Sequence, residues 1–66
     1  MKINSLKIKI LMLEKGFNIG SLAEKMGSTR QWVGAILGRG YATTNMVIKI
    51  SKALGVDPKE ISKLED

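Results

Sequence analysis

The chain has 66 residues, with 11 basic and 6 acidic side chains and a formal net charge of +5 at pH 7. It contains neither cysteine nor histidine, so disulfides and a Cys/His zinc site are excluded, and no enzyme activity, metal or cofactor is expected. A chain this short buries little surface, so we predict one domain over residues 1–66, stabilised by helix packing or by self-association.

The first predicted element is a helix at about Ser5–Lys15. Its apolar residues alternate with Lys7 and Lys9, which would also suit a strand, but the downstream patterns are all helical and leave a lone strand without a partner. Gly16 is placed to end the helix. The expected core face has helical spacing and consists of Leu6, Ile10, Leu13 and Phe17, widened by Ile8, Leu11 and Met12.

Two short helical patterns then meet at one glycine between Asn18 and Leu37. Asn18 suits the N-cap of the first helix, and Gly27 can take the left-handed conformation that ends it. Thr29 is placed to cap the second helix. The predicted apolar faces are Leu22, Ala23 and Met26 in the first helix and Val33, Ile36 and Leu37 in the second. Two helices joined by a tight glycine turn can place the second helix in a DNA major groove.

Two more helices are predicted after a glycine-containing loop at residues 38–43. Thr44 is placed to cap the fourth helix, which ends at Gly55, and the fifth begins with the Asp57-Pro58 pair, which suits an N-cap followed by the first helical position. Their expected apolar faces are Val47, Ile50, Ala53 and Leu54, then Ile61 and Leu64. The patterns therefore predict an all-α, compact five-helix domain, with the motif at about 18–37 and the fifth helix and acidic tail at 57–66.

Charge is distributed unevenly along the chain. Residues 1–52 hold nine basic against two acidic side chains, a balance of +7, and residues 53–66 hold two against four, a balance of −2. A polyanion such as DNA would be attracted to the first part, although a solvated basic surface explains the charge equally well. Lysines at positions 2, 7 and 9 interrupt every apolar run near the N-terminus. No signal peptide or membrane contact is expected, and the protein is predicted to be cytoplasmic.

The motif resembles the Cro/C1 (XRE-type) helix-turn-helix family of phage repressors and small bacterial regulators. The features that carry this resemblance are Asn18, Leu22-Ala23, Met26-Gly27 and Thr29. Residues 50–56, I-S-K-A-L-G-V, are similar to the segment that closes the family's fourth helix, so the likeness spans about residues 6–64. It implies a lambda-repressor-like fold and double-stranded DNA as the partner of a homodimer, with no small-molecule ligand.

Base contacts are expected from the exposed side of the predicted third helix. Helical geometry makes Gln31 and Ala35 its outermost positions, with Arg30 in the first turn, where recognition helices reach base edges. The resemblance implies base contacts by Arg30, Gln31, Gly34 and Ala35. Arginine pairs with guanine and glutamine with adenine, but Arg30 would serve equally on a phosphate, and Gly34 is compatible with having no role.

Contacts to the DNA backbone are expected on both sides of that helix. The peptide N–H groups at the start of the second helix suit a phosphate, and Trp32 suits either a phosphate contact or cover for the core edge. The full expected set is Asn18, Ile19, Gly20, Thr29, Trp32, Arg39, Tyr41, Thr43 and Asn45.

Three positions differ from the family pattern that the resemblance implies. Relatives often carry glutamine at the position of Ile19, so this residue is expected to contribute only its main chain. Relatives also have an arginine and a glutamate at the positions of Met12 and Leu37. We predict that these two side chains touch, and that an apolar contact replaces the ion pair at little cost in stability.

The sequence thus favours a sequence-specific DNA-binding transcriptional regulator of the Cro-like repressor type, which binds a pseudo-palindromic operator as a dimer. The self-association surface is expected at the C-terminal end, formed by Val56, Pro58, Ile61 and Leu64. The alternative is an antitoxin or adaptor-type protein-interaction module on the same fold, which apolar residues exposed on the fifth helix would favour. A membrane-active peptide is disfavoured by the well-capped later helices.

Overall fold

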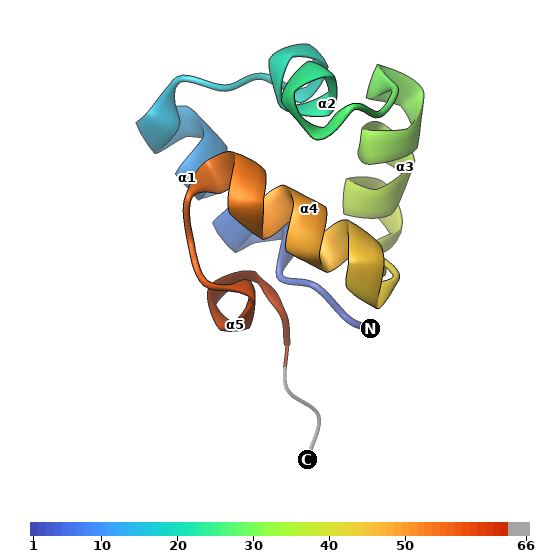
Figure 1. Ribbon diagram of the computed structural model, residues 1–66. Coiled ribbons are helices and arrows are strands. Elements are labelled where there is room, and N and C mark those ends of the chain that lie inside the picture. Colours follow the sequence, from blue (N-terminus) through green and yellow to red (C-terminus); the bar gives the residue numbers. More distant parts are fainter. Residues whose placement is uncertain (64–66) are drawn as a thin grey trace.

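The computed structural model describes residues 1–63, in which helices are joined by short turns (Figure 1). The helices are α1 (Ser5–Lys15), α2 (Ile19–Met26), α3 (Arg30–Arg39), α4 (Thr44–Leu54) and α5 (Pro58–Ile61). Within the described range the only β-structure is two isolated bridges. The predicted all-α fold with five helices is confirmed, and α5 is a single turn. Two predicted boundaries are wrong by one or two residues: Thr43, not Thr44, caps α4, and α3 continues through Gly38 and Arg39, which were expected in the loop, because Gly40 takes the left-handed conformation that ends it.

Local capping explains where the central helices begin and end. The Asn18 side chain accepts a hydrogen bond from Ser21 N at 2.8 Å, and Ser21 Oγ accepts one from Asn18 N at 2.9 Å. Gly27 ends α2 with φ +70°, a conformation that favours glycine, and Thr29 Oγ1 accepts from Trp32 N at 3.1 Å to open α3. The predicted helix-turn-helix boundaries therefore follow from side chains within the motif itself.

The core draws on every helix and on the N-terminal segment. The predicted apolar faces of α2, α3 and α4 are all buried, as are Ile3, Ala42 and Ile61. Met12 and Leu37 are both buried in this core, and their direct contact stays a prediction. None of the helices in residues 1–63 has the length and hydropathy needed to cross a membrane.

The predicted core face of α1 is wrong for Leu6, Ile10 and Leu13, whereas Leu11 and Phe17 pack against the core as expected. Leu6, Ile10 and Leu13 are 69%, 46% and 80% exposed, whereas Ile8 and Met12 are buried. Ile8 lies about 200° around the helix from Leu6, so both cannot face the same core. The helix has apolar residues on both sides, and packing against the rest of the molecule selects the side with Ile8.

The segment before α1 determines this orientation. Ile3 N donates to Gly40 O at 3.0 Å, and Asn4 N donates to Ile61 O at 2.8 Å, so the segment lies between the end of α3 and the end of α5. Ser5 Oγ donates to Leu37 O at 2.7 Å. These bonds join parts of the chain that are distant in sequence, and they hold the start of α1 against the C-terminal end of α3.

Candidate nucleic-acid interface

The helix α3 lies at one side of the molecule, on the far side of α4 from the C-terminal end of α1 (Figure 1). Val33, Ile36 and Leu37 are buried against the core. Arg30, Gln31 and Ala35, which point the other way, are exposed, and Gly34 is half-buried. The four residues predicted to read bases therefore occupy the outer side of one helix.

Gly34 has no side chain, so nothing projects from the outer side of α3 at this position. A Cβ placed on it would meet no atom within 4 Å, so packing inside the molecule does not require glycine here. A mid-helix glycine is less stable than alanine by about 1 kcal/mol. Its remaining benefit is clearance for a surface that approaches α3 from outside.

The start of α2 lies beside the first turn of α3. A Cβ placed on Gly20 would be 3.9 Å from Arg30 Cδ, so the arginine stem passes close to the α2 N-terminus. The N–H groups of Ile19 and Gly20 open the helix and have no intrahelical acceptor. Backbone donors, the positive end of the helix dipole and a guanidinium group thus meet at one place, an arrangement that suits a phosphate.

Three of the predicted backbone contacts also serve as helix caps. The side-chain oxygens of Asn18, Thr29 and Thr43 accept hydrogen bonds from Ser21 N, Trp32 N and Met46 N. A capping oxygen uses its acceptor capacity, so the threonine hydroxyl protons and the asparagine amide protons remain for an anion. Asn18, Thr29 and Thr43 are exposed, as is Asn45 in the first turn of α4.

A cation–aromatic cluster forms at the C-terminal end of α3. The Arg39 guanidinium lies 5.4 Å from the centre of the Trp32 ring, and Arg39 Nε donates to Tyr41 O at 3.1 Å. Trp32 is 43% exposed and Tyr41 52%, so neither belongs to the core. Trp32 and Arg39 are seven residues apart on one helix, a spacing that brings them to the same side and from which their pairing could have been predicted.

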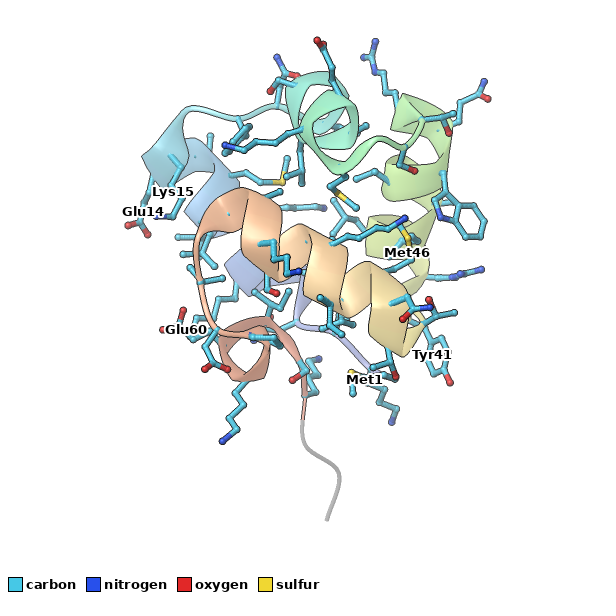
Figure 2. The ribbon with its side chains drawn as sticks, viewed as in Figure 1. Met1, Glu14, Lys15, Tyr41, Met46 and Glu60 are labelled. Carbon is cyan, nitrogen blue, oxygen red and sulfur yellow. The ribbon has the colours of Figure 1, made fainter. Side chains whose placement is uncertain are left out.

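The charge around this face is positive. Residues 25–56 contain five basic and no acidic side chains. An antiparallel bridge between Lys2 and Tyr41 adds another lysine next to the Trp32–Arg39 cluster. In Figure 2, Glu14 and Glu60 lie on the opposite side of the molecule from Tyr41 and Met46. These two carboxylates therefore lie away from the Trp32–Arg39 cluster.

The expected C-terminal self-association surface holds only in part. Val56 is half-buried and Pro58 exposed, but Ile61 is fully buried and belongs to the core, so its inclusion in that surface is wrong. Its burial follows from the one-turn α5, which directs its single large apolar side chain inward. Leu64, the fourth member, lies outside the described residues.

Comparison with known families matches residues 7–66 to the Cro/C1-type HTH DNA-binding domain. The match covers nearly all of the chain and includes both segments on which the predicted resemblance rested. Comparisons with curated proteins and with solved structures each found no match.

Proposed function

The chain belongs to the Cro/C1-type family of helix-turn-helix DNA-binding domains, and we propose that it is a sequence-specific transcriptional regulator of the Cro-like repressor type. It binds a pseudo-palindromic operator as a dimer and places one α3 in each of two major grooves about one helical turn apart. Bound there, it represses by blocking polymerase. The observation that carries the proposal is the outer side of α3, with Gln31 and Ala35 exposed and no side chain at Gly34.

Gln31 is the principal base reader in this proposal. It can bond the N6 and N7 edge of an adenine, and the Ala35 methyl group can meet a thymine methyl group once Gly34 allows close approach. Arg30 has two possible partners, a guanine edge or a phosphate. Its position beside Gly20 supports the phosphate, because the backbone donors at the start of α2 point to the same place.

Backbone contacts lie at both ends of α3. One group, at the start of α2, consists of Asn18, Ile19, Gly20 and Thr29. The other, at the end of α3 and the start of α4, consists of Trp32, Arg39, Tyr41, Thr43 and Asn45. A ten-residue helix is about 15 Å long, comparable with a major groove about 12 Å wide. The two groups are therefore spaced to hold α3 between the two phosphate strands.

An antitoxin or adaptor-type module remains the alternative. Apolar residues exposed on α5 would have favoured it, but Ile61 is buried. Three exposed aliphatic side chains, Leu6, Ile10 and Leu13, lie on α1 instead, where they could also serve the dimer of a regulator.

Selection of bound duplexes from a random DNA pool, at stated salt, tests the proposal. The wild type should recover a two-fold symmetric site, and a variant with both Arg30→Ala and Gln31→Ala should no longer select it. Weak and strongly salt-dependent binding to every sequence would contradict the proposal, because it would leave only a basic surface.

A further inference from the structure

We propose that the exposed side of α1, formed by Leu6, Ile10 and Leu13, packs against the same side of a second copy of the chain, with the two helices antiparallel. This inference rests on the proposed function for its purpose, since a two-fold operator calls for a dimer. The test of the inference is independent of the proposed function, because self-association is measured without DNA.

The three side chains form one continuous stripe. They lie at i, i+4 and i+7, within about 60° of arc around the helix, and all three are exposed. Spacings of four and three residues are those by which two helices pack along a shared seam. Ile8 and Met12, on the other side, already anchor α1 to its own core.

A hollow of about 330 Å³ adjoins the C-terminal end of the stripe. It is lined by Lys9, Met12, Leu13, Phe17, Asn18 and Ile19. The Lys25 ammonium lies 5.5 Å from the centre of the Phe17 ring, so this ring is also held from α2. Across an antiparallel pair, Leu6 of the second copy would lie near this hollow.

Charge on the flank of the stripe selects an antiparallel second copy. Lys7 and Glu14 lie on the same flank, two turns apart, and both are exposed. Neither has an ion-pair partner within residues 1–63. In a parallel pair the two copies of this flank would lie on opposite sides of the seam, so Lys7 and Glu14 would not meet, whereas a two-fold axis near Ile10 in an antiparallel pair sets each Lys7 against Glu14 of the second copy. The face is thus complementary to itself.

Leu6 shares a hollow with Arg39 and Tyr41, so the N-terminal end of the stripe borders the DNA-binding face, whereas the C-terminal end of α1 lies away from it. Glu14 and Lys15, at the end of α1, lie across the molecule from Tyr41 and Met46 (Figure 2). A standard interface covers about 800 Å² per partner, and this chain exposes 4349 Å² in all. Three side chains and a hollow cover less than the standard area. We therefore expect a dimer that dissociates at micromolar concentration and is held more firmly when both copies bind adjacent half-sites.

Sedimentation equilibrium of the full chain without DNA tests the inference. Between roughly 5 and 500 µM, the weight-average mass should rise from that of a monomer towards twice that value. Ile10→Glu, which places two carboxylates near the axis, should weaken association at least about tenfold. Ile48→Glu is the matched control, because Ile48 is a 38% exposed isoleucine on α4 away from the stripe, and it should leave association unchanged.

A charge exchange tests the orientation of the pair. Lys7→Glu and Glu14→Lys should each weaken association, and the variant with both changes should recover it. A monomer at every concentration, equal effects of Ile10→Glu and Ile48→Glu, or no recovery in the double exchange would overturn the inference. A dimer of this geometry that selects no DNA site would instead overturn the proposed function, so the two failures are distinguishable.

Discussion

The outer sides of α1 and α3 differ in chemistry although the two helices are of similar length. The outer side of α3 carries Arg30, Gln31 and Ala35, a surface of hydrogen-bonding groups and small residues in a positive field. The outer side of α1 carries Leu6, Ile10 and Leu13, which offer no hydrogen bond. Base edges are recognised by donors and acceptors, and an apolar helix stripe by another apolar stripe. We therefore assign DNA to α3 and a second copy of the chain to α1.

The largest expected effect separates the two sides of α1 itself. Ile8→Ala removes a fully buried side chain and should lower the free energy of unfolding by about 2–5 kcal/mol. Leu13→Ala, at an 80% exposed position, should change it by no more than about 0.5 kcal/mol in dilute protein. Urea denaturation followed by circular dichroism measures both. Equal losses would mean that the orientation of α1 described here is wrong.

The next effect concerns the base-reading side of α3. Gln31→Ala should weaken operator binding by about 1–3 kcal/mol, roughly 5- to 150-fold, because a bidentate contact to adenine is lost. The preference of the protein for a particular base should weaken at one base pair of each half-site and stay unchanged at the other base pairs. Competition binding against single-base operator variants measures this. A uniform loss over all positions would reassign Gln31 to a backbone contact.

A smaller effect is expected at the end of α3. Arg39→Ala should weaken binding to all sequences alike and reduce the slope of log affinity against log salt by about 1, because one phosphate contact is lost. Trp32 fluorescence should also shift, since the guanidinium no longer covers the ring. Lys59→Ala on α5 is the control and should leave the salt slope unchanged. A base-specific loss in Arg39→Ala would contradict the assignment.

The smallest effect is expected at Gly34. Gly34→Ala should raise the free energy of unfolding by up to about 1 kcal/mol, because the helix gains an alanine and the added methyl group meets nothing within 4 Å. Operator affinity should fall. Gly38→Ala, also in α3 and also unobstructed, should stabilise the protein similarly. Unchanged affinity in Gly34→Ala would remove the argument for close approach.

The sequence predicted best those features that depend on neighbouring residues. Asn18, Gly27 and Thr29 each act on peptide groups within a few positions, so the boundaries of α2 and the start of α3 were readable from local patterns. The apolar residues of α3 occupy a single stripe, and the inner and outer sides followed from helical spacing alone. The same reasoning placed Gln31 and Ala35 outside.

Features that depend on distant residues were not predictable in this way. The apolar residues of α1 surround most of the helix, so spacing allowed two core faces, and the bonds from Ile3 and Asn4 to Gly40 and Ile61 decided between them. The burial of Ile61 and the placement of Lys2 beside Tyr41 have the same origin. Both errors, on α1 and on α5, concern which apolar residues remain outside.

The central claim is that α3 reads DNA and α1 joins two copies, and one measurement tests both parts together. Wild type, Gln31→Ala and Ile10→Glu would be titrated onto duplexes that contain the complete selected operator or one half-site. We predict that Gln31→Ala weakens binding to both duplexes, whereas Ile10→Glu weakens binding only to the complete operator. Two results would contradict these assignments. One is that Ile10→Glu weakens binding to the single half-site as much as binding to the complete operator. The other is that Gln31→Ala leaves binding unchanged.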